Sequence, residues 1–143
     1  MKHILFFGSI AFVFLIFSCK KEAKPEDLIL GKWKVTKLIV DGEDIVAISP
    51  DYQTQVEVEF TKSGTVVFNI KNIDYTKSPA ELEETSASGT YSWDGGKITI
   101  SVDDVGDLLS VTGNVDVTEN RLLINATSGD TVDFFSLLEA DKL

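Results

Sequence analysis

Histidine and cysteine are almost absent from this chain. Its 143 residues contain one histidine, His3, and one cysteine, Cys19. A single cysteine cannot form an internal disulfide, and Ser-His-Asp or Cys-His catalysis needs a histidine beside the nucleophile. Zinc prefers histidine and cysteine ligands, so the same two counts argue against a zinc site. We therefore expect a protein that is not an enzyme and that uses no metal or other cofactor.

Positive charge is also scarce. The chain has 13 Lys and Arg residues against 23 Asp and Glu residues, a formal net charge of -10 and a pI near 4.4. Such a surface repels phosphate backbones, which argues against nucleic acid as a partner. Asp103, Asp104 and Asp107 lie close together in the sequence. They lack the Asp-x-Asx-x-Asx-Gly spacing of a calcium loop, so we interpret them as a solvated acidic loop.

The longest apolar run lies at the N-terminus and is too short to span a membrane. Ile4 to Phe17 is a run of 14 residues without a charge, whereas a spanning helix needs about 20. A short apolar run behind a basic residue, here Lys2, is typical of a secretory signal peptide. The run ends in Ile16-Phe17-Ser18-Cys19, which resembles the lipobox of bacterial lipoproteins. The resemblance predicts a signal peptide over residues 1–18 and lipidation of Cys19.

The nine residues 19–27 are expected to join the lipid anchor to a folded domain. Lys20 to Asp27 are polar and include one proline, as is typical of a flexible tether. The anchor predicts attachment to a membrane of the bacterial cell envelope. The outer membrane is favoured, and its periplasmic or surface face stays open. The remaining residues, 28–143, suffice for one domain but not for two.

Apolar and polar residues alternate with a period of two through much of this domain. The clearest examples are residues 55–61 and 65–71, which flank the turn signal Lys62-Ser63-Gly64. The alternation predicts two antiparallel strands, each with one buried face, joined as a hairpin. Residues 72–87 break the pattern. We interpret them as a long loop or lid, with one or two helical turns possible around 79–84.

Turn signals divide the rest of the domain into further strands. Asp41-Gly42, Asp94-Gly95-Gly96 and Glu119-Asn120 each separate two alternating segments. Gly113 falls within one of these strands and is interpreted as a bulge or a bend. About eight strands and no amphipathic helix of useful length predict an all-β fold. The pattern fits an antiparallel meander, either closed into a barrel or folded as a sandwich.

Two motifs favour the barrel through a family resemblance. Leu30-Gly31-Lys32-Trp33 opens the domain, and Gly89 to Ile100 has the sequence GTYSWDGGKITI. With the leader, these motifs resemble the lipocalin-like domain lipoproteins of Bacteroidota, short β-barrels with a Gly-x-Trp motif. The resemblance spans about residues 28–143. It implies a lipocalin-like up-and-down barrel of about eight strands, with Gly31 and Trp33 in structural roles and Trp33 closing one end.

The chain also departs from this family. It lacks the helix and the late arginine that often pack over the Gly-x-Trp tryptophan, and its only arginine, Arg121, does not lie at the corresponding place. Lipocalin relatives mostly bind small apolar molecules, which implies a cup-shaped interior. These departures favour instead an interior that is filled by side chains.

Four aromatic side chains are the candidate ligand contacts: Phe60, Phe68, Tyr91 and Trp93. Tyr91 and Trp93 are two residues apart and so share one face of a strand, where they line a pocket or pack in the core. The first hypothesis is a membrane-anchored, non-catalytic barrel that binds a small apolar or amphipathic ligand. The alternative is a packed barrel that binds an envelope protein or a glycan through loops such as 43–54 and 72–87.

Overall fold

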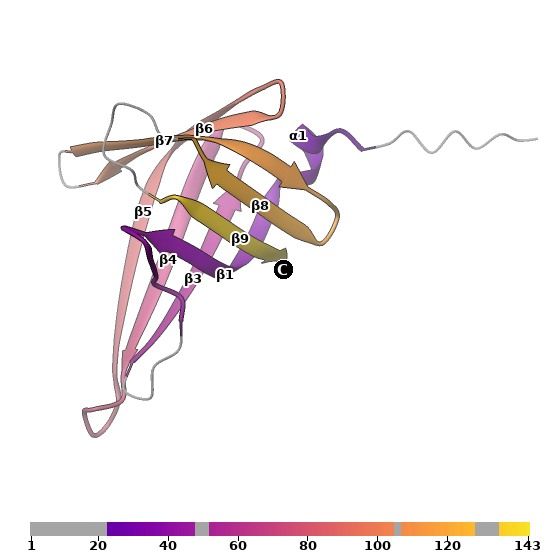
Figure 1. Ribbon diagram of the computed structural model, residues 1–143. Helices are drawn as coiled ribbons and strands as arrows, with labels where there is room; N and C mark the ends of the chain where they lie inside the picture. The colour runs from indigo at the N-terminus through magenta and orange to yellow at the C-terminus, as the bar shows by residue number, and fades with distance from the viewer. Residues whose placement is uncertain (1–22, 48–51, 105–106, 128–134) are drawn as a thin grey trace, which may run out of the picture.

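Neighbouring strands pair along the whole chain, and the last strand returns to the first (Figure 1). The computed structural model describes residues 23–47, 52–104, 107–127 and 135–143. Within them, one short helix, α1 (Pro25–Leu28), precedes all the strands. The strands are β1 (Gly31–Val40), β2 (Glu43–Asp44), β3 (Tyr52–Phe60), β4 (Thr65–Asp74), β5 (Glu81–Asp94), β6 (Lys97–Asp104), β7 (Asp107–Val117), β8 (Arg121–Ala126) and β9 (Leu137–Lys142).

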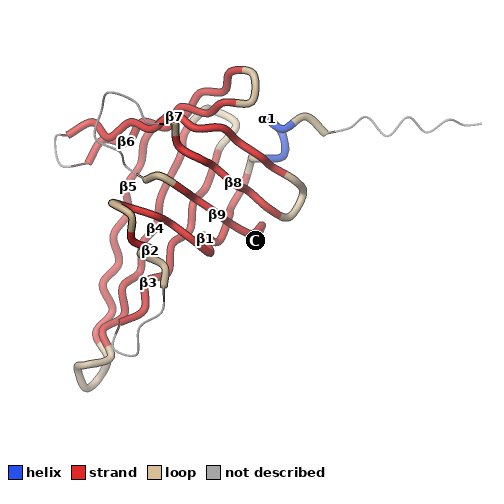
Figure 2. Tube along the Cα trace, viewed as in Figure 1, coloured by secondary structure: helices blue, strands red, loops and turns tan. Residues whose placement is uncertain are grey.

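The pairing order makes an up-and-down barrel. Each strand from β3 to β9 pairs antiparallel with the next, and β1 pairs with both β3 and β9, which closes the ring (Figure 2). The two-residue strand β2 pairs only with β1 and stays outside the ring. The Asp41-Gly42 turn joins them, and both of its residues have positive φ, as a tight hairpin requires. The prediction of an all-β barrel is confirmed, and the sandwich alternative is wrong.

Hydrophobic side chains fill the inside of the barrel. The buried hydrophobic residues are at most 4% exposed. Among the described residues, these buried side chains pack against one another as a single core. Burial of each such side chain contributes about 1.5–3 kcal/mol relative to exposure. The core residues are Ile29, Trp33, Val35, Leu38, Val56, Val58, Phe60, Val66, Phe68, Ile98, Ile100, Val102, Val111, Leu122, Ile124, Phe135, Leu138 and Ala140.

Residues 72–87 are not one long loop or lid: 72–74 and 81–87 are strand and only 75–80 form a turn, so the interpretation of this segment was wrong. β4 continues to Asp74, and β5 begins at Glu81 after a short turn. The two strands pair without interruption from Thr65↔Thr90 to Asp74↔Glu81. Glu81 to Ser86 are exposed on both faces, so the segment has no alternation that a sequence pattern could reveal. Pairing with β4 decides the conformation here, against the low strand propensity of these residues.

Gly89 is the point at which β5 and β6 separate. β6 pairs with β5 only between Gly89↔Val102 and Asp94↔Lys97, and then continues alongside β7. A Cβ atom on Gly89 would lie 1.9 Å from the carbonyl oxygen of Ser101. Only glycine therefore allows the two backbones to approach this closely. Gly113 has a similar role in β7, because a Cβ atom there would lie 2.7 Å from the Asn125 carbonyl oxygen. The pairing of β7 with β6 and with β8 continues in register through Gly113, so there is no bulge at this residue.

Beyond this separation, three strands extend past the barrel. β1 pairs with β3 no further than Val35↔Val56, so the far ends of β3, β4 and β5 continue without β1 or β6 beside them. We call this extension the ribbon and define it as residues 52–55, 71–74 and 81–86. It projects from the lower end of the barrel in Figure 1, away from α1.

Replacement of Gly89 by alanine tests whether the separation depends on a backbone without a side chain. Because the new Cβ would overlap the Ser101 carbonyl, we expect Gly89→Ala to lower the free energy of unfolding by about 1–3 kcal/mol or more. The measurement is urea unfolding followed by circular dichroism. Ser88→Ala, at an exposed neighbouring position, is the matched control and should change stability little. Equal stability of the two variants would contradict this account of Gly89.

Candidate functional site

The end of the barrel near α1 is closed over Trp33. Its side chain is 0% exposed, and its indole Nε1 donates a hydrogen bond to the Ile29 carbonyl oxygen at 2.7 Å. The Lys142 ammonium lies 4.2 Å from the centre of the indole ring and donates hydrogen bonds to the carbonyl oxygens of Leu28 and Leu30. A cation over a tryptophan face is attracted by the ring quadrupole. Trp33 therefore joins the first strand to α1 and to the last strand.

This arrangement corrects one sequence interpretation. The expected late arginine over Trp33 is absent, as the sequence indicated, but the Lys142 ammonium lies over the indole ring and Ile29, directly after α1, accepts its hydrogen bond. The alternation in the last strand could have predicted this position of Lys142. Leu138 and Ala140 face the core, and Lys142 follows them with the same period of two. Burial lowers the pKa of the Lys142 ammonium. Gly31 has φ +104°, and its Cβ would approach the Lys142 Nζ to 3.3 Å, which explains the glycine of the motif.

A surface pocket of about 370 Å³ opens beside this closed end. Two of its lining residues are Tyr91 and Trp93, both half-buried. The Tyr91 hydroxyl donates a hydrogen bond to the Thr61 carbonyl oxygen at 2.8 Å, and burial raises the pKa of this phenol. The Tyr91 ring meets Phe60 edge to face, with 5.1 Å between ring centres. The other lining residues are Glu26, Asp27, Leu30, Lys62 and Gly64.

The structure divides the four aromatic candidates into two groups. Tyr91 and Trp93 line the pocket, whereas Phe60 and Phe68 are each 1% exposed and lie in the core. Phe60 contacts the Tyr91 ring edge to face. Neither Phe60 nor Phe68 is among the lining residues of the pocket. The pocket therefore combines two aromatic rings with carboxylates from α1 and one lysine. Such a mixture suits a small amphipathic molecule better than a purely apolar one.

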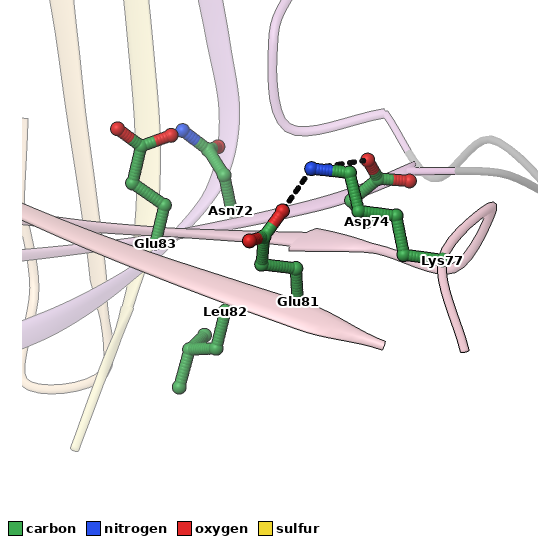
Figure 3. Close-up of a pocket in the computed structure, with 6 residues that line it drawn as sticks. All are labelled: Asn72, Asp74, Lys77, Glu81, Leu82 and Glu83. Atoms are coloured by element: carbon green, nitrogen blue, oxygen red, sulfur yellow. Dashed lines mark hydrogen bonds and ion pairs between the residues drawn. The ribbon is translucent and has the colours of Figure 1, made fainter. Parts of the chain in front are cut away.

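The ribbon carries a second hollow, of about 450 Å³, that is polar. Asn72 and Asp74 of β4 lie directly opposite Glu83 and Glu81 of β5. In Figure 3 these four side chains occupy one face of the ribbon, and Leu82 points to the other face. Lys77, from the turn between the two strands, and Leu82 are the other two lining residues.

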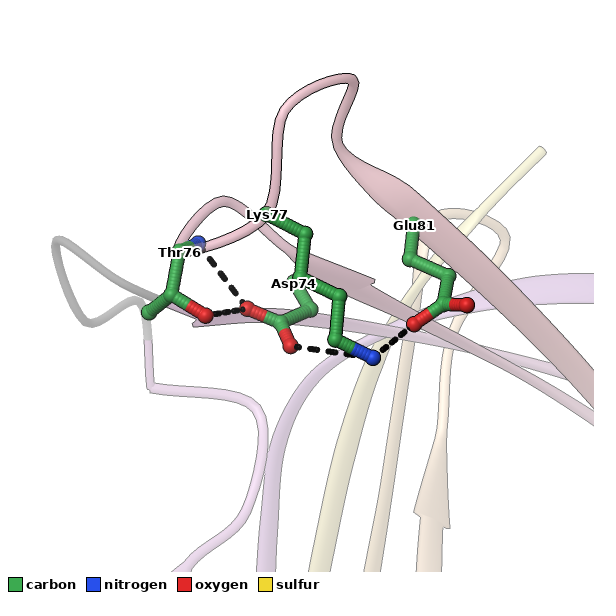
Figure 4. A network of polar contacts seen from close by, with 4 residues as sticks. All are labelled: Asp74, Thr76, Lys77 and Glu81. Carbon is green, nitrogen blue, oxygen red and sulfur yellow. Dashed lines mark hydrogen bonds and ion pairs between the residues drawn. The ribbon is translucent and has the colours of Figure 1, made fainter.

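Hydrogen bonds and ion pairs organise the tip of the ribbon (Figure 4). The Asp74 carboxylate accepts hydrogen bonds from the Thr76 backbone N–H at 2.9 Å and from the Thr76 hydroxyl at 2.5 Å. These bonds, with the nearby Lys77 ammonium, lower the pKa of Asp74. Lys77 also pairs with Glu81 across the turn. Exposed ion pairs stabilise little, so this network mainly sets the shape of the turn.

Apolar side chains lie on the opposite face of the ribbon. Leu82 is 56% exposed and Tyr75 is 51% exposed, and the Tyr75 hydroxyl donates a hydrogen bond to the Gln53 side chain at 3.0 Å. Beside them, Lys71 and Glu84 form an ion pair of 3.2 Å. The alternative hypothesis expected a binding loop at residues 72–87. The segment is instead mostly paired strand, with charged, polar and apolar groups on its surface.

Two further observations concern possible metal ligands and membrane-spanning helices among the described residues. Within the described ranges, no three His, Cys, Asp or Glu side chains are grouped as they would be around a metal ion. In the same part of the chain, no helix has the length and apolar character needed to cross a membrane. Cys19 and the expected signal peptide lie outside the described residues, as do the side chains of Asp103, Asp104 and Asp107.

Comparison with known proteins assigns the family. A family model described as a lipocalin-like domain matches residues 29–137. The chain belongs to the lipocalin-like domain family. Among solved structures, it is similar to a lipocalin-like protein from Bacteroides uniformis ATCC 8492, with 18% identity and a TM-score of 0.46 over 80% of this chain and 97% of that chain. No curated protein matches this chain.

The family assignment confirms the resemblance that the Gly-x-Trp motif suggested. The matched range includes Gly31, Trp33, the ribbon and the pocket residues Tyr91 and Trp93. It ends before Lys142, so the basic residue over Trp33 lies beyond the matched segment of this lipocalin-like protein.

The phenol of Tyr91 generates a prediction about pH. Its pKa is raised in the folded state, so the folded protein holds this proton more tightly than the unfolded chain does. The resulting stability is fully present below the unfolded pKa of about 10 and is lost as the pH rises through the folded value. We therefore expect Tyr91→Phe to lose about 1 kcal/mol at pH 7, through the missing hydrogen bond. Its stability should fall less steeply than that of the wild type above pH 10.

Urea unfolding between pH 7 and pH 11 measures this difference. Tyr75→Phe is the control, because the Tyr75 hydroxyl is an exposed donor to Gln53. A Tyr91→Phe variant whose stability runs parallel to that of the wild type across this range would contradict the assignment.

Proposed function

We propose that this lipocalin-like protein is a non-catalytic, lipid-anchored binding protein that recognises an envelope protein through its ribbon. One observation carries the proposal: the described core is buried, whereas the ribbon projects from the barrel and its β5 segment, Glu81 to Ser86, is exposed on both faces. A strand segment without a buried face gains little hydrophobic stabilisation. The ribbon is nevertheless paired without interruption and is organised at its tip by Asp74, Thr76 and Lys77. A protruding, well-defined surface of this kind suits recognition of a partner.

The expected anchor supports this arrangement. Lipidation of Cys19 would attach the tether to a membrane of the cell envelope, with the outer membrane favoured. Two or more acyl chains suffice for stable attachment, because each buried methylene contributes about 0.8 kcal/mol. The tether leads into α1, at the end of the barrel opposite the ribbon (Figure 1). An anchor at Cys19 would therefore leave the ribbon at the end of the molecule away from the attachment point.

The pocket at Tyr91 and Trp93 favours a second candidate function. Its two half-buried aromatic rings, with Glu26, Asp27 and Lys62 around them, suit a small amphipathic ligand. In this alternative the protein is a ligand carrier or sensor that uses the outside of the closed barrel end rather than the interior.

Site-specific photo-cross-linking in the native host tests the ribbon. We expect a photoreactive residue in place of Leu82, which is 56% exposed, to give a discrete protein adduct of constant mass. The same residue in place of Lys34, exposed on the β1 wall of the barrel, is the control and should give none. Equal adducts at both positions, or none at Leu82, would argue against recognition through the ribbon. Native mass spectrometry that finds a small-molecule adduct, lost in Trp93→Ala, would favour the second candidate.

The anchor has a separate test. Because only Cys19 supplies a thiol for lipidation, we expect Cys19→Ser to move from the membrane fraction to the soluble fraction of the cell. Fractionation followed by mass spectrometry of the N-terminal peptide measures both location and acylation. A wild-type N-terminal peptide that carries no acyl mass on Cys19 would refute the anchor and leave the ribbon proposal in place.

A further inference from the structure

We propose that the outer edge of β5, along Glu81–Ser88, accepts an extended basic segment of a partner protein as an additional strand. We call this edge, on the side of β5 away from β4, the β5 edge. The inference rests on the proposed function, since it states how the ribbon would bind and what class of partner it fits. Strand addition uses main-chain hydrogen bonds for affinity and side chains for specificity.

The β5 edge has no strand beside it in the described part of the chain. β4 pairs with β5 from Asp74↔Glu81 to Thr65↔Thr90, whereas β6 pairs with β5 only from Gly89 onward. The side chains of Glu81 to Ser86 and of Ser88 are all exposed, and no described strand other than β4 pairs with this stretch. Eight residues exceed the mean strand length of about 5–6, which gives a partner strand enough pairing positions.

The hydrogen-bond pattern identifies the backbone groups that face outward. The Tyr91 N–H donates to the Gly64 carbonyl oxygen at 2.8 Å, so the backbone of Tyr91 points toward β4. The register is uninterrupted down to Glu81, and orientation alternates in an antiparallel pair. The odd-numbered residues of this segment therefore bond to β4. The N–H and C=O groups of the even-numbered residues lie on the open side, and these residues are Leu82, Glu84, Ser86 and Ser88.

Charge decides which kind of strand fits. The edge carries Glu81, Glu83 and Glu84, and a second copy of this chain would add three more glutamates alongside. Like charges on paired strands are destabilising, and charged residues commonly protect edges from self-association. Lys77 pairs with Glu81 and Lys71 with Glu84. No ion pair to Glu83 is present among the described residues.

A strand with lysine or arginine would meet the opposite charge here. Glu81 and Glu83 lie on one face of β5, and Leu82 lies on the other face (Figure 3). A partner strand with basic residues on the first face would meet Glu81 and Glu83, and an apolar residue on the second face would meet Leu82. Glu84 shares the second face with Leu82 and is already paired with Lys71.

Two measurements on the full-length lipidated protein in detergent test the proposal. The probe is an acetylated seven-residue peptide that alternates lysine and valine. Two control peptides replace valine by proline, which keeps the charge but prevents β-pairing, or lysine by glutamate. We expect the Lys-Val peptide to bind about tenfold or more tightly than either control. We also expect it to slow amide hydrogen exchange at Leu82, Glu84, Ser86 and Ser88, but not at Glu83, Thr85 or Ala87, whose amides already bond to β4.

A charge variant completes the design. Glu83→Lys changes an exposed side chain and should weaken the Lys-Val peptide about tenfold. Asp116→Lys, at an exposed position on β7, is the matched control and should leave binding nearly unchanged.

Three outcomes would overturn strand addition. The first is equal binding of the Lys-Pro and Lys-Val peptides. The second is that the Lys-Val peptide does not slow exchange at the even-numbered amides. The third is that these amides are already protected in the absence of peptide, to a degree that increases with protein concentration. The last outcome would assign the edge to a second copy. If one of these outcomes is found while the photoreactive residue at position 82 still gives a specific cross-link, the ribbon remains the recognition surface and only strand addition is refuted. If position 82 gives no specific cross-link, the proposed function itself is refuted.

Discussion

The contact between the backbones of Gly89 and Ser101 determines the course of two strands. At this point β5 and β6 are so close that a Cβ atom would overlap a carbonyl oxygen. On one side of it, β5 is a wall of the barrel between β4 and β6. On the other side, β6 turns away with β7, and β5 continues with β4 alone. The closed ring and the ribbon both depend on this close approach, because β5 has to serve both as a wall of the ring and as part of the extension beyond it.

The opposite end of the barrel depends on Trp33. Its ring is buried, its indole N–H is bonded to Ile29, and its face carries the Lys142 ammonium. These contacts join the helix that follows the tether, the first strand and the last strand into one closed end. Lys142 is also bonded to carbonyl oxygens around α1, so its charge is balanced by dipoles as well as by the ring. The Tyr91–Trp93 pocket lies beside this closed end, and the ribbon projects from the opposite end of the barrel.

In the function that we propose, recognition takes place on the outside of the barrel rather than inside it. Phe60 and Phe68 stabilise the core and are not accessible to a ligand. Tyr91 and Trp93 lie between the core and the surface. Each side chain is half-buried and also lines the pocket. Burial of apolar surface contributes little to the stability of the ribbon. Its β5 edge has backbone N–H and C=O groups that would be paired with a neighbouring strand in a closed barrel. We infer that a lipocalin-like fold can in this way present a binding surface while its interior stays packed.

The sequence by itself determined the barrel class and most of the strand positions. A period of two records one buried face, and residues such as Val56, Phe60, Val66 and Phe68 report that face directly. The Gly31-Lys32-Trp33 motif likewise predicted a closed end. The tertiary structure alone decided the ribbon, because Glu81 to Ser86 bury neither face and so leave no alternation. It alone placed Lys142 over Trp33, since contacts between chain ends depend on closure of the ring. It also separated the accessible aromatic residues from the buried ones, because position along the barrel, rather than strand face, sets exposure.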